Sequence, residues 1–211
     1  VILMIMEYHN SVLLSESIDA LSIKKDGIYV DVTFGGGGHS REMLKRLGSN
    51  GMLLAFDQDP DAKRNKIEDS RFILIEENFR YISRFLKFYG IKKVDGVLAD
   101  LGVSSHQFDE AERGFSIRFD GELDMRMNQS SKNSAKKIIN TYPEDKLADI
   151  LFIYGELRNA RSIAKTIVEE REIKNIDTSF QLRSVLQRYL PKAKEHKILA
   201  QIFQAIRIEV N

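Results

Sequence analysis

The chain has 211 residues, 43% of them hydrophobic, which is enough to fill the core of one large domain or of one domain with an insertion. Its 32 lysine and arginine residues nearly balance its 31 aspartate and glutamate residues, so the net charge of +1 neither favours nor excludes nucleic acid as a partner. The lack of cysteine excludes disulfide bonds and thiolate zinc sites and is typical of a reducing cytoplasm, and the four histidines show no metal-ligand spacing, so we expect no metal.

The first 27 residues contain one short apolar run and one amphipathic pattern. Residues 1–7 are mostly apolar, but the run is too short to span a bilayer and lacks the basic flank of a signal peptide. No later run reaches membrane length, so we expect no membrane partner. Apolar residues at 12–14, 18 and 21 predict a short helix, and Gly27 ends a turn into the first strand.

The chain is organised around a strand, a glycine turn and a helix. Residues 28–34 are apolar and β-branched apart from Asp31, which predicts a buried strand. Four glycines follow at 35–38, and then a helical pattern over residues 41–47. Glycine lets the backbone pass close to a ligand, and a helix N-terminus offers free N–H groups. A plain turn would need only one glycine, so the pattern favours a ligand site, in which a side chain at Gly37 is expected to obstruct the ligand and leave the fold intact.

Three more buried strands are predicted, at residues 52–56, 72–75 and 94–101. The first of these is followed by a helix that begins near Asp59, with a proline in its first turn, and the second by a helix through residues 82–89. Strands and helices that alternate at these lengths predict a parallel, doubly wound sheet, which is an α/β fold.

The alternation stops near residue 103. Residues 104–130 are polar, but apolar side chains within them predict an ordered loop rather than a linker. These anchors are Phe108, Phe115, Phe119, Leu123, Met125 and Met127. From Ser134 onward the apolar spacing is helical only, which predicts a block of helices.

Two carboxylates frame the glycine loop. Asp31 lies inside the first strand, and Asp57 ends the second, where an acid can accept hydrogen bonds from both hydroxyls of a ribose. A dinucleotide-binding loop would place a third glycine where His39 and Ser40 stand. An acid upstream of the loop suits a ligand with an ammonium group and no pyrophosphate. S-adenosylmethionine, which combines an amino acid, a sulfonium, a ribose and an adenine, is such a ligand.

Two further residues lie at predicted strand ends, where open α/β sheets bind ligands. Phe79 can lie against adenine or belong to the core at a helix entry, and the sequence leaves both interpretations open. Asp100 can cap a helix, but a second carboxylate beside Asp31 in a cleft costs stability unless something uses it.

Eight stretches of the chain form an ordered set of motifs. They are Tyr8–Leu14, Thr33–Ser40, Asp100–Gln107, Glu112–Ser116, Leu123–Met127, Tyr154–Glu156, Ala164–Ile167 and Phe203–Asn211. With this set, the chain from about Tyr8 to Asn211 closely resembles the bacterial small-subunit (16S) rRNA cytosine-N4 methyltransferases.

The resemblance implies a Rossmann-like class I methyltransferase sheet, with its first four parallel strands present and a helical domain inserted after the fourth. It implies S-adenosylmethionine as the cofactor, the ribosomal RNA of the assembled small subunit as the partner, and methylation of the exocyclic N4 of a cytosine in the decoding centre. The implied cofactor-binding residues are Gly37, Gly38, His39, Asp57, Phe79, Asp100 and Gln107.

Three segments are expected on this basis. Residues 1–110 would bind S-adenosylmethionine, residues 111–196 would form an inserted loop and helical substrate-recognition domain, and residues 197–211 would return as a helix to the methyltransferase domain. Members of the family continue beyond a motif like residues 207–211, so we expect a C-terminally truncated chain. Its fourth strand would be an open apolar edge, and we expect the chain either to self-associate through this edge as a homo-oligomer or to be poorly soluble. The alternative is a non-catalytic fragment that binds cofactor or RNA only.

The chemistry needs help from the protein because the lone pair of the cytosine amine is delocalised into the ring. An enzyme must hold N4 in line with the methyl group, accept a hydrogen bond from the N–H and take up a proton late. We expect Asp100, Ser104 and Ser105 to be the catalytic residues. Asp124 and Arg126 are weaker candidates, for which an ion pair that ties the loop is the favoured interpretation.

Three clusters of cations are candidates for contact with RNA. The first is Arg80, Arg84, Lys87, Lys92 and Lys93, the second is Lys132, Lys136 and Lys137, and the third is Arg183, Arg188, Lys192, Lys194 and Lys197. A run of charges is usually a solvated face, so the sequence does not choose among them.

Overall fold

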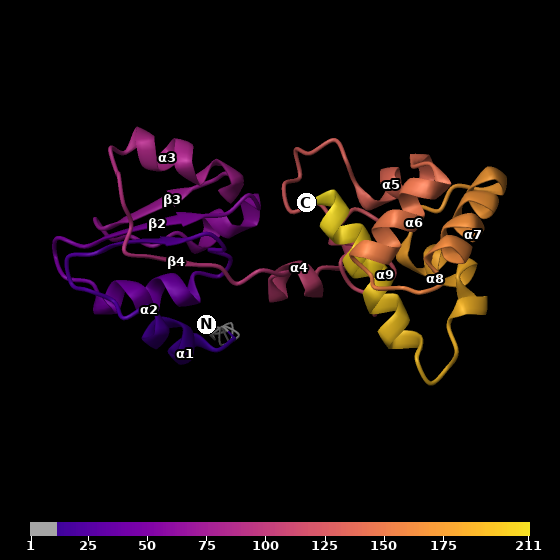
Figure 1. The fold of residues 1–211 in the computed structure, drawn as a ribbon, viewed down its shortest axis with the longest axis horizontal. Helices are drawn as coiled ribbons and strands as arrows, with labels where there is room; N and C mark the ends of the chain where they lie inside the picture. Colours follow the sequence, from indigo (N-terminus) through magenta and orange to yellow (C-terminus); the bar gives the residue numbers. More distant parts are fainter. Residues whose placement is uncertain (1–11) are drawn as a thin grey trace, which may run out of the picture. The chain divides into compact units, whose positions relative to one another are not determined.

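The computed structural model describes residues 12–211 (Figure 1). The beginning of the first motif, Tyr8–Ser11, lies outside the described residues. The chain forms two compact units, a sheet unit up to Ser104 and a helical unit over residues 105–211. The functional division at 110/111 and 196/197 stays a prediction.

The sheet unit contains four parallel strands in the order β3-β2-β1-β4, which confirms the predicted parallel α/β sheet. They are β1 (Ile28–Asp31), β2 (Met52–Phe56), β3 (Phe72–Ile75) and β4 (Gly96–Leu98). β1 and β4 end earlier than predicted because side chains take up the next backbone groups. The Thr33 N–H donates to Asp31 Oδ1 at 3.0 Å, and the Asp100 N–H donates to Thr33 Oγ1 at 2.8 Å.

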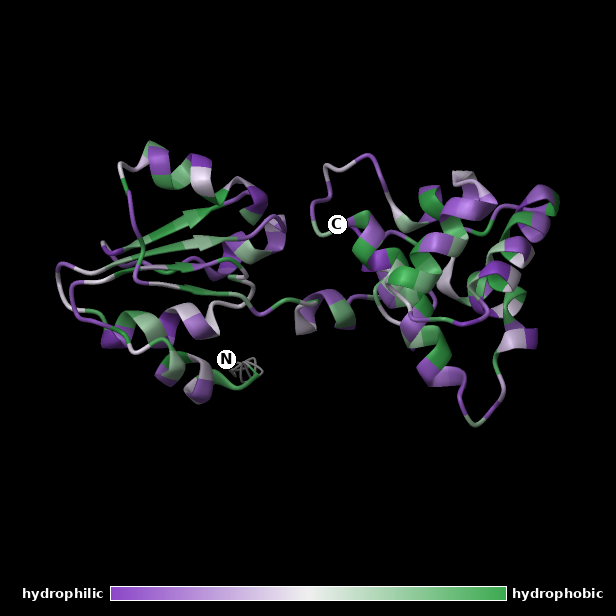
Figure 2. Ribbon diagram, viewed as in Figure 1, coloured by the Kyte–Doolittle hydropathy of each residue, from purple (hydrophilic) through white to green (hydrophobic). Residues whose placement is uncertain are grey.

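Helices cover both faces of the sheet, as the alternation of side chains in buried strands requires. They are α1 (Leu14–Ala20), α2 (Gly38–Arg46) and α3 (Ile82–Phe88). Tyr29 and Leu53 pack with α1 and α2, whereas Leu54 and Phe56 pack with α3, where the rings of Phe56 and Phe85 meet edge-on at 5.8 Å. Figure 1 shows α1 and α2 on one side of the strands and α3 on the other, and Figure 2 shows apolar residues along the strands between them.

Two short 3-10 helices follow the strands at the C-terminal rim of the sheet. They are η1 (Pro60–Asn65) and η2 (Phe79–Tyr81). Asp59 caps η1 by accepting the Asp61 N–H at 3.1 Å, with Pro60 in the first turn as predicted. Asn78 caps η2 by accepting the Arg80 N–H at 2.8 Å. These caps hold the backbone where the predicted ligand residues lie.

The helical unit consists of helices and one long loop between residues 113 and 135. The helices are α4 (Ser105–Asp109), η3 (Ala111–Arg113), α5 (Ala135–Thr141), α6 (Glu144–Ile153), α7 (Ala160–Ile173), α8 (Ser179–Val185), η4 (Gln187–Tyr189) and α9 (Glu195–Val210). α7 and α9 each pack against α5 and α6. Leu147, Leu151, Ile163 and Ile202 are buried there. The predicted return of residues 197–211 to the methyltransferase domain stays a prediction. Within residues 12–211, no helix combines the length and the apolar composition needed to cross a bilayer.

Candidate functional site

The glycine loop connects β1 to α2 in a conformation that requires glycine. Gly35 has φ +50° and Gly37 has φ +75°, both in the left-handed region. A Cβ on Gly37 would lie 2.6 Å from Arg41 Nη1 and 2.8 Å from the Phe34 ring, whereas the nearest atom to a Cβ on Gly35 is 4.0 Å away. The expectation that a side chain at Gly37 leaves the fold intact is therefore wrong, because it would strain the backbone and crowd Phe34. The helix also starts at Gly38, three residues earlier than predicted, with Gly37 as its N-cap.

Asp57 anchors the glycine loop to the end of β2. Its Oδ2 accepts the Gly35 N–H at 2.7 Å and its Oδ1 accepts the Asp59 N–H at 2.9 Å. On the other side of the loop, the Asn65 amide donates to the Gly35 carbonyl at 3.0 Å. Burial raises the pKa of the Asp57 carboxyl, and the two backbone N–H groups oppose that rise. Each carboxylate oxygen keeps a further lone pair, so Asp57 can accept a ribose hydroxyl while it holds the loop.

Asp31 is the most deeply buried acid of the rim, with no exposed surface. Its Oδ2 accepts the Ser40 hydroxyl at 2.7 Å, and its Oδ1 accepts the Thr33 N–H at 3.0 Å. Burial raises the pKa of Asp31, while these donors and the nearby His39 lower it. No lysine or arginine of the described chain forms an ion pair with it. A buried carboxylate charge without an ion-pair partner lowers the stability of the fold, and such carboxylates are typical of ligand-binding sites.

His39 brings a second uncompensated group to the same rim. It lies in the first turn of α2 and is only 5% exposed, and its Nε2 is buried without a hydrogen-bond partner among residues 12–211. Buried polar atoms almost always have partners, so an orphan of this kind marks either strain or the place of a ligand atom. Its position beside Asp31, at a glycine loop, favours a ligand.

Phe79 and Asp100 also lie at strand ends. The Phe79 ring is 42% exposed, which argues against its being a core residue. The Asn78 amide donates to Gln58 Oε1 at 3.0 Å, which connects the start of η2 to the residue next to Asp57. Asp100 is exposed, and its backbone N–H bonds Thr33 Oγ1. Asp100 is not the cap of α4, which begins at Ser105.

The predicted site residues divide between the two units. Gly37, Gly38, His39, Asp57, Phe79 and Asp100 lie in the sheet unit, around the C-terminal ends of the strands. Ser104 is the last residue of that unit, whereas Ser105 and the buried Gln107 lie in α4 of the helical unit. The roles predicted for Ser104, Ser105 and Gln107 stay predictions.

Sequence reasoning missed three residues that organise the rim. Thr33 and Ser40 bind the two oxygens of Asp31, and Asn65 holds the glycine loop. An aspartate side chain commonly accepts the backbone N–H two residues on, so the contact between Asp31 and Thr33 could have been predicted. Ser40 and Asn65 carry no such local signal. Across the described part of the chain, no group of three or more histidine and acidic residues is placed to hold a metal ion.

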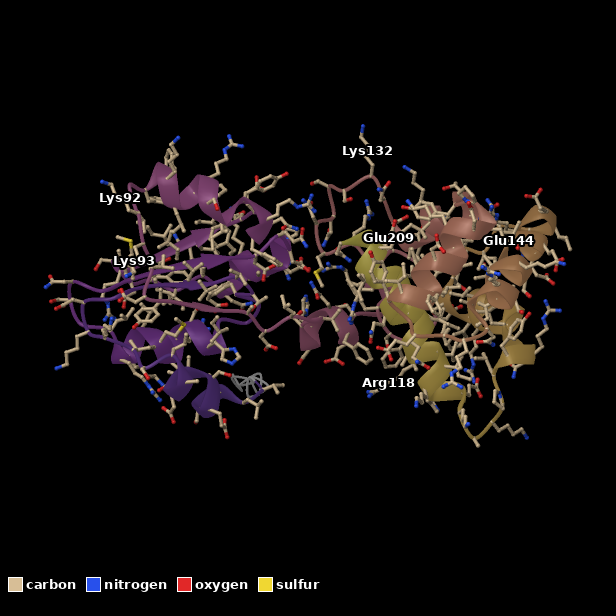
Figure 3. The ribbon with its side chains drawn as sticks, in the orientation of Figure 1. Lys92, Lys93, Arg118, Lys132, Glu144 and Glu209 are labelled. Atoms are coloured by element: carbon tan, nitrogen blue, oxygen red, sulfur yellow. The ribbon has the colours of Figure 1, made fainter. Side chains whose placement is uncertain are left out.

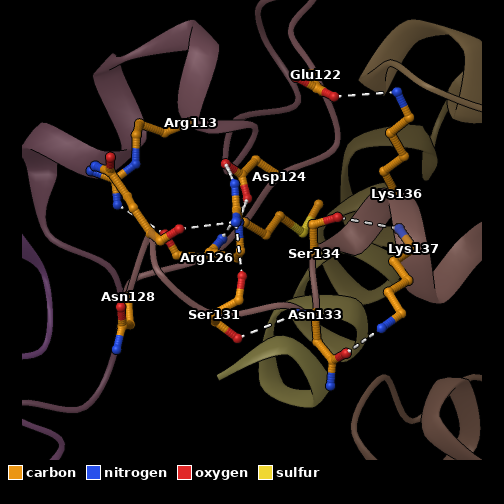
Figure 4. Close-up of polar contacts among 12 residues, drawn as sticks. Arg113, Glu122, Asp124, Arg126, Asn128, Ser131, Asn133, Ser134, Lys136 and Lys137 are labelled. Atoms are coloured by element: carbon orange, nitrogen blue, oxygen red, sulfur yellow. Dashed lines mark hydrogen bonds and ion pairs between the residues drawn. The ribbon is translucent and has the colours of Figure 1, made fainter.

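The long loop of the helical unit is tied by its own polar contacts (Figure 4). Asp124 and Arg126 form an ion pair, and Arg126 Nη1 donates to the carbonyls of Gln129 at 2.9 Å and Ser131 at 2.8 Å. The Asn211 side chain accepts the Met127 N–H and donates to the Met125 carbonyl, both at 2.7 Å. These contacts match the interpretation of Asp124 and Arg126 as a pair that ties the loop.

Comparisons with known proteins show the family of the chain. The model of the MraW methylase family matches residues 6–211. A ribosomal RNA small subunit methyltransferase H of Christiangramia forsetii is 66% identical over 209 residues, which are 99% of this chain and 69% of that protein. Proteins of the same name from Flavobacterium johnsoniae and Bacteroides fragilis are 63% and 55% identical, over 98% and 97% of this chain and 68% and 67% of their own lengths.

Proposed function

Because the chain belongs to the MraW methylase family, we propose that it transfers a methyl group from S-adenosylmethionine to the ribosomal RNA of the small subunit in the cytoplasm. The proposed target is the exocyclic N4 of a cytosine in the decoding centre. The rRNA substrate is supported by the names of the relatives, and the N4 target by the motifs that the chain shares with cytosine-N4 methyltransferases. The observation that supports the cofactor most directly is the rim of the sheet beside the glycine loop. Among the described residues, the buried carboxyl of Asp31 has no ion-pair partner and the buried Nε2 of His39 has no hydrogen-bond partner.

The residues of the rim fit S-adenosylmethionine in chemistry. Asp31 is an acid that suits an ammonium group, Asp57 has lone pairs for ribose hydroxyls, and Phe79 exposes a ring to an adenine. When bound, the cofactor supplies a methyl group activated by a sulfonium. The residues proposed to hold it are Gly37, Gly38, His39, Asp57, Phe79, Asp100 and Gln107.

The acceptor amine would be oriented by Asp100, Ser104 and Ser105. The backbone of Asp100 is fixed by Thr33 while the residue itself is exposed at the rim, so its carboxylate is available to accept a hydrogen bond. An acceptor of this kind localises the amine lone pair and later takes its proton. We further propose that the helical unit recognises the RNA.

Binding without methyl transfer is the second candidate, and one experiment separates the two. Calorimetry with S-adenosylmethionine and transfer of a labelled methyl group to unmethylated small subunits would be measured on the same chain. We expect both signals, with the label on N4 of one cytosine. Cofactor binding without transfer would support the second candidate, and no cofactor binding would contradict both.

Phe79→Ala is the variant that probes the cofactor site with least damage to the fold. Because the ring is 42% exposed, its loss should change the free energy of unfolding little, yet it should weaken S-adenosylmethionine binding by about 1–3 kcal/mol, the range for an aromatic ring stacked on a base. Phe152→Ala, at an aromatic 62% exposed in α6, is the matched control. Equal affinities in the two variants would remove Phe79 from the site.

A further inference from the structure

The surface of α3 that points away from the sheet carries cations and one strongly exposed aromatic ring. Ile82, Phe85 and Leu86 fix the helix on the sheet core. Residues three and four positions apart share a helix face, so Arg84, Lys87 and Phe88 fall on the opposite, solvent side. Phe88 is 77% exposed, and its ring meets that of Tyr89 in an edge-type arrangement, with 5.1 Å between the centroids.

Two more cations extend this surface past the end of α3. The Gly90 N–H donates to the Lys87 carbonyl at 3.1 Å and the Ile91 N–H donates to the Leu86 carbonyl at 2.8 Å, so the chain folds back onto the helix before Lys92 and Lys93. Both lysines are exposed and project from the segment between α3 and β4 (Figure 3). We name Arg80, Arg84, Lys87, Phe88, Lys92 and Lys93 the α3 surface.

The α3 surface carries an excess of positive charge, of which Asp95 offsets a part, since Lys93 lies near enough to lower the pKa of that carboxyl. Residues 78–93 contain five cations and no acidic residue. None of the five forms an ion pair with a carboxylate of the described residues. Cations of this kind can replace the counterions condensed on the phosphates of a polyanion, and the release of those counterions favours binding.

The other two basic clusters differ in this respect. In the second, Lys136 lies 3.3 Å from Glu122 and 3.2 Å from Asp177. In the third, Arg183 is paired with Glu195 at 2.7 Å, and the aromatic residue on the same helix, Phe180, is 41% exposed, against 77% for Phe88. Among these three clusters of the described residues, the α3 surface has the most exposed aromatic ring and is the one in which no cation is paired with a carboxylate.

Cations that alternate with exposed rings are the pattern that binds single-stranded nucleic acid, because phosphates pair with the cations and an unstacked base packs on the ring. We propose that the α3 surface binds a single-stranded stretch of the ribosomal RNA as a second contact, separate from the cofactor rim. This proposal rests on the function proposed above. The contact supplies affinity and position and takes no part in methyl transfer.

The test measures the salt dependence of binding of the full chain to a labelled single-stranded pyrimidine RNA of about 12 nucleotides, within the usual site size. Arg84→Ala, Lys87→Ala and Lys93→Ala are combined in one variant. Each lost phosphate contact lowers the slope of log K against log salt by about 0.7, so the triple variant should lose about 2 in slope and more than about tenfold in affinity at about 0.1 M salt. Phe88→Ala should lose at least about fivefold in affinity with the slope unchanged.

Matched controls remove the same charge and the same ring elsewhere. Lys25→Ala, Lys45→Ala and Lys66→Ala, three exposed lysines of the sheet unit outside the basic clusters, are combined as the charge control, and Phe152→Ala is the ring control. We expect both controls to bind the RNA as the parent does. Equal losses in the two triple variants, or no loss in either, would overturn the proposal. So would unchanged RNA binding with loss of binding to phosphatidylserine vesicles, which would assign the surface to lipid.

Calorimetry with S-adenosylmethionine distinguishes this proposal from the function on which it rests. The variants of the α3 surface should keep the cofactor affinity of the parent chain. A parent chain that binds the RNA through the α3 surface but binds no cofactor would retain the inference and contradict the proposed function. If the parent chain binds cofactor and methylates small subunits, and the α3 variants lose no RNA affinity, the proposed function is supported and the inference about the α3 surface is contradicted.

Discussion

Asp31→Asn tests whether the buried charge at the rim serves the fold or a ligand. The asparagine keeps an oxygen for the Thr33 N–H, and its amide can donate to the Ser40 hydroxyl, because a hydroxyl both donates and accepts. The substitution therefore removes the charge and leaves the hydrogen bonds and the volume nearly unchanged.

The expected gain in stability follows from the raised pKa of Asp31. A carboxyl with a pKa above its ordinary value binds its proton more tightly in the folded than in the unfolded state, so the free energy of unfolding falls as the pH rises from about 4 through the raised pKa. We expect Asp31→Asn to raise the free energy of unfolding at neutral pH by about 0.5–2 kcal/mol, the usual size of a single stabilising substitution, and to flatten its pH dependence. The pKa of Asp57 is also raised, so Asp57 makes the free energy of unfolding fall with rising pH in the parent chain and in the variant alike.

Native-state hydrogen exchange of the amides in β1 and β2 is the suitable assay, because two compact units can unfold separately and would blur a global transition. Ser40→Ala is the opposite control, since it keeps the charge, removes a donor and should cost about 1–3 kcal/mol. If Asp31 meets an ammonium group, Asp31→Asn should also weaken S-adenosylmethionine binding by about 1.5–3 kcal/mol. A destabilised variant with unchanged cofactor affinity would refute the reasoning and assign the charge to the fold.

Three further substitutions test other parts of the structure. Gly37→Ala should lower the free energy of unfolding by about 1–3 kcal/mol, because the alanine strains the backbone and its Cβ crowds the Phe34 ring. Thermal unfolding should show a smaller loss of stability in Gly35→Ala, where only the backbone is strained. Val97→Lys places a charge on β4, which has a neighbouring strand on only one side in the described chain and a Val97 side chain 46% exposed. It should abolish any concentration-dependent association seen by sedimentation, and association that persists would exclude this edge. Asn211→Ala removes two hydrogen bonds to the long loop, so limited proteolysis should cut within residues 125–131 faster than in the parent chain.

The sheet could be predicted because its signals are local. The strands at residues 52–56 and 72–75 are short apolar runs between turn residues, and the structure gives the same bounds for β2 and β3. The errors occur where side chains compete with the backbone ladder. β1 ends at Asp31 because that carboxylate takes up the Thr33 N–H, and apolar content alone does not reveal such competition.

The site could be predicted in its place but not in its contacts. A parallel sheet brings its strand ends to one rim, so Asp57 and Asp100 were expected there from topology alone. The bonds from Asp57 to Gly35 and from Ser40 to Asp31 join residues 22 and 9 positions apart, and they depend on the exact path of the loop. Exposure could not be predicted either, and it is the exposure of Phe79 that argues against a core role.

The same contacts explain why substitutions of Asp57 and Gly37 cannot by themselves reveal function. Asp57 holds Gly35, and Gly37 is required by Phe34, so removal of either side chain or addition of one alters the loop before any ligand arrives. Asp31 and His39 are different, because their burial costs free energy that the described contacts do not return. A group that destabilises the free protein is retained through what it binds. Variants that gain stability and lose affinity are therefore the informative ones at this rim, and Asp31 is the residue where the two effects are expected to have opposite signs.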